Sequence, residues 1–261
     1  MKELKGKKAI ITGASSGFGV DFANIFAEMG MDVIIVARRR ERLEKTGKEI
    51  EEKYGVKSKV IAMDLAGIEA ARKLCELVNE DEVEVLVNNA GYGIFGYAGE
   101  QDVKEVDSMI QLNVSTVAAL TNIFLEKMIN RDSGYILNVA SFAGFSPMPL
   151  YAAYAATKAF VMNYSVSIHT ELREKNSGVV VSAFCPGYTK TEFIDVARQK
   201  KSPFVRMVTG ESFPAAKKAV KAMFRGKAVC MPGIINKTGA LILKFMSRKA
   251  AAKLIYNAVK K

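Results

Sequence analysis

Short runs of β-branched and apolar residues alternate along this chain with longer segments of helical periodicity. This order is typical of parallel strands joined by crossover helices. It predicts an α/β fold, a doubly wound parallel sheet of about seven strands with helices on both faces. The expected strands are Lys8 to Thr12, Asp32 to Ala37, Lys57 to Met63, Val83 to Val87, Gly134 to Ala140, Val179 to Phe184 and Lys227 to Met231. The expected helices are one that ends at Gly30 and those at Arg42 to Tyr54, Gly67 to Asn79, Asp102 to Arg131 and Tyr154 to Lys175.

The composition bounds the size of the fold and its compartment. The 261 residues are 49% hydrophobic and 25% charged, as in an ordinary globular protein, and this length is near the upper limit for one core. With no internal repeat or linker, residues 1–261 are expected to form a single domain. No apolar run approaches the roughly 18 residues of a membrane span, and no signal-peptide core follows residues 1–8. These features predict a cytoplasmic protein.

Histidine and cysteine are too scarce for several kinds of site. His169 is the single histidine, which excludes the common zinc and non-haem iron sites that need two or three imidazoles. Cys75, Cys185 and Cys230 are too scattered for a C-x-x-C clip. We therefore expect neither a metal nor a disulfide framework, which fits a reducing compartment.

A glycine-rich turn, TGASSGFG, follows the first expected strand at 12–19. Such a turn lets the backbone approach a pyrophosphate closely, and the following helix offers free N–H groups and its positive dipole to the phosphates. Glycine turns between a strand and a helix also occur as plain structure. If the turn binds a dinucleotide, the contacts are expected from Gly13, Ser15, Ser16, Gly17, Phe18 and Gly19.

The end of the second expected strand bears on the choice of cofactor. A dinucleotide fold that prefers NAD places an Asp or Glu there to hold the ribose 2′-hydroxyl, whereas this chain has Ala37, Arg38 and Arg39. A guanidinium can pair with a 2′-phosphate in two hydrogen bonds, so we expect NADP(H) to bind at Arg38 and Arg39. We expect Arg40 to be a solvent-exposed residue at the start of the next helix. Asp64, after the third strand, is placed to accept from the adenine amino group.

A tyrosine with a lysine four residues later is a pattern suited to proton transfer at a carbonyl, because an ammonium on the same helix face favours the phenolate. The chain contains two such pairs. Tyr256 and Lys260 lie in the tail without accompanying site residues, so we interpret that pair as a chance match. Tyr154 and Lys158 open the helix after the fifth strand, and Ser141 ends that strand. The sequence context therefore favours Tyr154, and not Tyr256, as the residue that transfers the proton.

At this point the sequence resembles the short-chain dehydrogenase/reductase family. The motifs occur in family order: TGASSGFG at 12–19, Asp64, NNAG at 88–91, Asn113, Ser141, YAATK at 154–158 and PGYTKT at 186–191. The resemblance implies a Rossmann-type fold in which Tyr154 is the general acid/base, while Lys158 lowers its pKa and holds the nicotinamide ribose. It also implies that Ser141 orients the carbonyl and that Asn113 holds a water of the proton relay. The further cofactor contacts that it implies are Leu65, Asn89, Ala90, Gly91, Pro186, Gly187, Thr189 and Thr191.

Within the family, the chain looks most like the bacterial reductases akin to hydroxysteroid dehydrogenases and 3-oxoacyl reductases. The stretches that carry this likeness are VARRRERL at 36–43, NNAGYG at 88–93, Pro232-Gly233 and Asn236-Lys237. Phe18 departs from the usual Ile or Leu. Ser16 stands where some NADP enzymes have Arg, which leaves the 2′-phosphate to Arg38 and Arg39. Since family members pack their two long helices against symmetry mates, the resemblance also implies a homodimer or homotetramer.

Two other function classes stay open. Gly13 to Gly17 matches the G-x-S-x-G elbow of serine hydrolases, with Ser15 as nucleophile and His169 as the available base. His169 lies inside a helical pattern and not on a late loop, which disfavours a hydrolase. The other alternative is a non-catalytic NADP-sensing protein that keeps the fold. Such a protein has no need for the complete set of four residues to which the resemblance assigns catalysis.

Positive charge is concentrated in the last quarter of the chain. Residues 190–261 hold 17 Lys and Arg against three acidic residues, a net charge of +14, whereas residues 1–189 carry −3. The segment at about 188–215 breaks the helix and strand rhythm and mixes aromatic, aliphatic and basic residues. We expect it to be a substrate lid.

A basic amphipathic helix is expected at about 239–260. One side holds Lys244, Arg248, Lys249, Lys253 and Lys260, and the other holds Leu241, Phe245, Ala252, Ile255 and Val259. The apolar side is expected either to pack on the body or a neighbouring subunit, or to lie on an anionic membrane surface. Lid and tail together predict a hydrophobic ketone or alcohol with a remote negative charge, such as a bile-acid-like steroid or a 3-oxoacyl thioester. Nucleic acid is not an expected partner.

Overall fold

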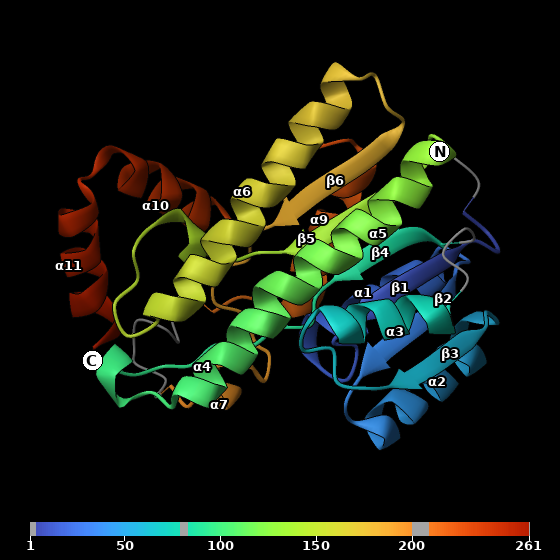
Figure 1. Ribbon diagram of the computed structural model, residues 1–261, viewed down its shortest axis with the longest axis horizontal. Helices are drawn as coiled ribbons and strands as arrows, with labels where there is room; N and C mark the ends of the chain where they lie inside the picture. The colour runs from blue at the N-terminus through green and yellow to red at the C-terminus, as the bar shows by residue number, and fades with distance from the viewer. Residues whose placement is uncertain (1–3, 79–82, 200–208, 261) are drawn as a thin grey trace.

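A single sheet of seven parallel strands forms the centre of the molecule (Figure 1). The structure, a computed structural model, describes residues 4–78, 83–199 and 209–260. The strand order is β3-β2-β1-β4-β5-β6-β7, and every neighbouring pair is parallel. The strands are β1 (Lys8–Thr12), β2 (Asp32–Ala37), β3 (Ser58–Ala62), β4 (Val83–Asn88), β5 (Gly134–Val139), β6 (Val179–Phe184) and β7 (Val229–Cys230). The predicted doubly wound parallel sheet is confirmed.

Helices cover both faces of the sheet and enclose two separate cores. They are α1 (Gly17–Glu28), α2 (Arg40–Tyr54), α3 (Ile68–Leu77), α4 (Val103–Ile110), α5 (Val117–Asn130), α6 (Ala152–Glu174), α7 (Phe193–Val196), α9 (Ser212–Phe224), α10 (Ile234–Phe245) and α11 (Arg248–Val259). One core contains side chains of α1, α2 and α9, and the other contains side chains of α3, α5 and α6. Successive residues of a strand point to opposite faces, so Ile10 and Ile11 of β1 are buried in different cores.

The predicted helix at Asp102 to Arg131 is one continuous helix with a local change of winding. α4 passes into the π-helical turn η3 (Gln111–Thr116) and then into α5. Short π-helical turns inside α-helices often occur at functional sites. The whole helix, Val103–Asn130, is long and apolar enough to cross a membrane by length and composition alone. Helices that line a protein core pass the same test, and here Leu120 and Phe124 are buried against the sheet.

The C-terminal segment differs from its prediction. The single helix expected at about 239–260 is two helices, α10 and α11, because Met246 adopts an extended backbone and Ser247 caps the second helix at the Ala250 N–H. The break changes the helical phase, so the predicted apolar side does not stay together. Val259 of α11 is buried, whereas Phe245 of α10 is 81% exposed. Figure 1 shows both helices at the end of the molecule opposite β3.

The predicted lid at 188–215 contains ordered elements at both ends, α7 and the start of α9. A β-bridge joins Thr189 to Gly210, and the Lys190 N–H donates to the Gly210 carbonyl at 2.9 Å. Residues 200–208 lie outside the described part of the chain. The described ends of this segment are therefore held together beside β6.

Candidate active site

The sheet topology creates a crevice where β1 and β4 lie side by side. The chain runs outward from β1 to β3 on one side and from β4 to β7 on the other, so the connections leave the carboxyl ends of these strands in opposite directions. A cavity of about 610 Å³ occupies this edge. All but two of the site residues expected from the sequence line it, the exceptions being Gly19 and Asn113.

The glycine turn between β1 and α1 forms one wall of the cavity. Gly13 and Gly17 have φ of +69° and +53°, which side-chain-bearing residues rarely adopt. A Cβ at Gly13 would lie 2.8 Å from the Asn89 amide, and one at Gly17 would lie 2.9 Å from Thr191. At Gly19 a Cβ would lie 2.2 Å from the Gly13 carbonyl oxygen. Gly19 thus has a packing role beneath the turn, and its expected cofactor contact stays a prediction.

The segment after β4 is tied to the end of β1. The Thr12 hydroxyl accepts from the N–H groups of Asn89 and Ala90 at 2.9 and 3.0 Å, and the Asn89 amide donates to the Thr12 carbonyl at 2.9 Å. These bonds hold the two loops of the crevice at a fixed separation. Gly91 follows, and a Cβ there would lie 2.7 Å from Asn113 Oδ1.

Arg39 bridges the two sides of the cavity rim. Its guanidinium donates to the hydroxyls of Ser15 and Ser16, each at 2.9 Å, and to the Glu192 carboxylate at 2.8 Å. Arg42 donates to the same carboxylate, and these two hydrogen bonds lower the pKa of Glu192. Arg38 is more exposed and lies 4.0 Å from Asp64. Glu192, which the sequence analysis did not single out for this site, holds the arginines toward the glycine turn.

Tyr154 and Lys158 lie on the first turns of α6, and both side chains are buried. Burial raises the pKa of the Tyr154 phenol above its ordinary value, and a hydrogen bond with Ser141 partly opposes this shift. Burial lowers the pKa of Lys158 to about 8. The Lys158 ammonium donates to the Val139 carbonyl at 2.8 Å. Desolvation is thus the largest effect on the pKa of the Tyr154 phenol, and the expected lowering of this pKa by Lys158 stays a prediction.

Ser141 and Asn113 support this pair from two other elements. Ser141 caps the 3-10 turn η4 (Phe142–Phe145), and its hydroxyl accepts from the Ala143 N–H at 3.1 Å. Asn113 is fully buried in η3, where its amide donates to the Tyr92 carbonyl at 2.9 Å and to the Thr157 hydroxyl at 3.1 Å. Asn113 thus joins the π-helical turn to α6 and to the loop after β4 without facing the cavity.

The segment after β6 closes the opposite wall. The Pro186 carbonyl accepts from the Phe142 N–H at 2.8 Å, which fixes this segment to the turn that carries Ser141. A Cβ at Gly187 would lie 2.4 Å from the Asn236 side chain of α10. Thr189 and Thr191 line the cavity beyond it.

The matching family model identifies the chain's relatives. The short chain dehydrogenase model matches residues 7–202. The chain belongs to the short-chain dehydrogenase family. The predicted resemblance is confirmed. Similar curated proteins are the very-long-chain 3-oxoacyl-CoA reductase-B of Danio rerio, 34% identical over 197 residues, and the very-long-chain 3-oxoacyl-CoA reductase of Anas platyrhynchos, 35% identical over 215 residues.

These matches cover 74% and 78% of this chain, but 63% of the fish protein and 68% of the duck protein. The chain thus spans about two thirds of the length of these two curated relatives. Among solved structures, a short-chain dehydrogenase from Sphingobium yanoikuyae in complex with NADPH is similar with a TM-score of 0.81 and 26% identity. That likeness covers 93% of this chain and 97% of the other.

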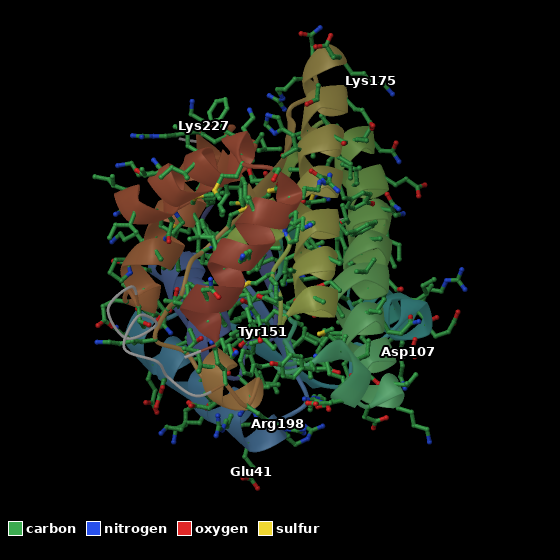
Figure 2. The ribbon with its side chains drawn as sticks, turned by 90° about the vertical axis from the view of Figure 1, so that its left-hand side faces the viewer. Glu41, Asp107, Tyr151, Lys175, Arg198 and Lys227 are labelled. Atoms are coloured by element: carbon green, nitrogen blue, oxygen red, sulfur yellow. The ribbon has the colours of Figure 1, made fainter. Side chains whose placement is uncertain are left out.

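The sequence did not single out all of the aromatic residues that lie beside Tyr154 in the site. The rings of Tyr151 and Phe193 lie 5.6 and 5.1 Å from the ring of Tyr154, and the Tyr151 hydroxyl donates to Gln199 at 2.9 Å. Figure 2 shows Tyr151 near the lower end of the C-terminal helices. The position of Tyr151 three residues before Tyr154, at the N-cap of α6, was the available signal.

The position of His169 disfavours a serine hydrolase, which would need this residue as its base. Nδ1 of His169 lies 2.8 Å from the Val181 carbonyl of β6, inside the protein. Ser15 instead accepts from Arg39 on the cavity rim. Burial also raises the pKa of the Cys185 thiol to about 12, so the cysteine beside the cavity behaves as a small apolar residue.

Proposed function

We propose that this short-chain dehydrogenase uses NADP(H) to transfer a hydride between the nicotinamide and a ketone or secondary alcohol. The observation that carries the proposal is the buried Tyr154, which lines the same cavity as Ser141, Lys158 and the glycine turn. The residues fit a dinucleotide, since the closely packed Gly13 and Gly17 leave room for phosphates at the start of α1. The bound cofactor supplies the hydride.

The side chains of the site orient the substrate oxygen and supply its proton. Ser141 donates a hydrogen bond to the carbonyl oxygen and orients it beside Tyr154. Because its pKa is raised, the Tyr154 phenol keeps its proton near neutral pH and is suited to donate it to a developing alkoxide. Lys158, mostly protonated below its pKa of about 8, supplies positive charge on the adjacent turn of α6. These protonation states favour carbonyl reduction.

The choice of NADP(H) rests on the arginines at the end of β2. Arg38 and Arg39 line the cavity, and Arg39 is aimed at the glycine turn by Ser15, Ser16 and Glu192. A dianionic 2′-phosphate at this rim would accept charge-assisted hydrogen bonds from Arg39. The Asp64 carboxylate stands farther along the rim, where we assign it to the adenine.

The proposed substrate is a hydrophobic ketone with a remote negative charge. The C-terminal helices contribute an apolar cavity wall made of Ile235, Ile242, Leu243, Leu254, Ile255 and Val259. The names of the fish and duck relatives favour a 3-oxoacyl thioester over a bile-acid-like steroid. The basic character of the last quarter of the chain favours an anionic substrate.

The test is a kinetic panel with NADPH as reductant. We expect kcat/KM to be highest for 3-oxoacyl thioesters, lower for a bile-acid ketone and lowest for small neutral ketones. Equal values across the panel would contradict the substrate assignment. Tyr154→Phe keeps the packed ring but lacks the transferable proton, so turnover should fall below about a tenth of wild type while NADPH affinity stays nearly unchanged.

A further inference from the structure

The outward face of α10 exposes large apolar side chains to solvent. Ile234 and Phe245 are 83% and 81% exposed, and Leu241 between them is also exposed. Steps of seven and four residues place these three side chains on one stripe of the helix. Scattered apolar side chains are normal on a protein surface, but a continuous stripe marks an interaction surface. We call these three residues the α10 stripe.

Positive charge borders the α10 stripe, and the C-terminal region has no acidic residue to balance it. Lys237 and Lys244 are exposed on α10 at positions that flank the stripe along one side. Lys249 and Lys253 are exposed on α11, and Lys260 is exposed directly after it. The sequence contains no Asp or Glu after Glu211. The surface of these two helices therefore combines hydrocarbon with cationic charge.

The same two helices form part of the cavity wall. Ile235 and Ile242 lie next to the α10 stripe around the helix and line the cavity, as do Ile255 and Val259 of α11. In Figure 2 this region lies in front of the sheet, facing the viewer. A partner bound to the α10 stripe would thus lie on the outer side of the two helices whose inner side lines the cavity.

Three kinds of partner can be compared by charge and polarity. A second copy bound face to face would oppose two lysine-rich pairs of helices that carry no acidic residue of their own, and that repulsion is unfavourable. An acidic protein would satisfy the lysines but would leave Ile234, Leu241 and Phe245 against polar groups. An anionic bilayer offers both acyl chains for the stripe and phosphates for the lysines.

We propose that the α10 stripe docks on an anionic phospholipid bilayer. Ile234, Leu241 and Phe245 enter the boundary between headgroups and acyl chains, and Lys237 and Lys244 lie at the level of the lipid phosphates. Docking in this way brings the α10–α11 wall of the cavity to the membrane surface, where lipophilic molecules concentrate. The proposal does not depend on the proposed enzymatic activity.

Vesicle co-sedimentation without cofactor or substrate tests the docking. We expect the protein to bind phosphatidylcholine vesicles that contain phosphatidylglycerol and to bind pure phosphatidylcholine vesicles at least about tenfold more weakly. Phe245→Glu and the double variant K237E/K244E should each lower partitioning by at least about tenfold, since one places a charge in the interface and the other reverses the electrostatic attraction. Leu77→Glu, at an exposed apolar position on α3, is the matched control and should bind like wild type.

Several results would overturn the proposal. These are wild-type protein that stays in the supernatant with anionic vesicles, or a Phe245→Glu variant that sediments as well as the Leu77→Glu control. A Phe245→Glu variant that changes the oligomeric state by light scattering, with no vesicle binding by wild type, would assign the stripe to a contact between copies. A circular-dichroism spectrum and Tm like those of wild type show that Phe245→Glu is folded, so a loss of vesicle binding then reports on the surface itself.

Discussion

Replacing Arg38 and Arg39 together by alanine tests the proposed NADP(H) preference. A hydrogen bond to a charged group contributes a net stabilisation of about 1.5–3 kcal/mol. The Arg39 side chain is 43% exposed and is shared with Glu192, so the lower value, about 1.5 kcal/mol, applies to its pairing with a 2′-phosphate. Arg38 is 73% exposed, and water screens its contribution to about 0.5 kcal/mol. The double variant should therefore lose about 2 kcal/mol, a rise of about 30-fold in KM for NADPH.

The assay is steady-state kinetics with NADPH and NADH on three proteins. Arg40→Ala is the matched control, because Arg40 lies one position farther along the chain and pairs with Glu44 at 3.5 Å on α2. We expect the control to resemble wild type and the R38A/R39A variant to keep its KM for NADH. Equal losses for both cofactors would show that Arg38 and Arg39 serve the fold and not the 2′-phosphate. An equal loss in Arg40→Ala would show that general positive charge is responsible.

Three further predictions concern the fold and assembly. Lys158→Met should abolish turnover yet raise Tm near pH 7, because burial lowers the pKa of Lys158 from 10.5 to about 8. Burying the charged ammonium lowers the free energy of unfolding by up to about 3 kcal/mol, and its hydrogen bond to Val139 offsets about 1 kcal/mol of this. The gain in Tm should shrink between pH 8 and 10, because the folded wild type loses this proton there. An unchanged or lower Tm at pH 7 would argue against this cost. Gly19→Ala should weaken the binding of NADPH and of NADH by at least about tenfold, since its Cβ would lie 2.2 Å from the Gly13 carbonyl oxygen. The control is Gly99→Ala, whose Cβ meets nothing within 4 Å, and similar cofactor affinities in the two variants would be inconsistent with this packing role. Light scattering at micromolar concentration should show a homodimer or homotetramer, and a monomer would refute that expectation.

The sequence by itself determined the order of the elements and most of the cavity wall. Strand and helix periodicity are local properties, so the limits of β1, β2 and β6 match the expected ranges. Glycines at a strand-to-helix turn and a tyrosine four residues before a lysine are also local signals. Because a parallel sheet places all carboxyl ends of its strands at one edge, these motifs meet around the cavity at that edge.

Tertiary structure decided the properties that depend on residues distant in sequence. The raised pKa of Tyr154 results from burial among several elements, which the Tyr-x-x-x-Lys spacing does not report. Glu192 holds Arg39 across 153 positions of sequence. The amphipathic pattern of the tail predicted one helix, but the extended backbone at Met246 divides it into two, and α10 packs with Phe245 exposed. Periodicity identifies an apolar face, whereas only the packed structure decides whether that face meets the core or the solvent.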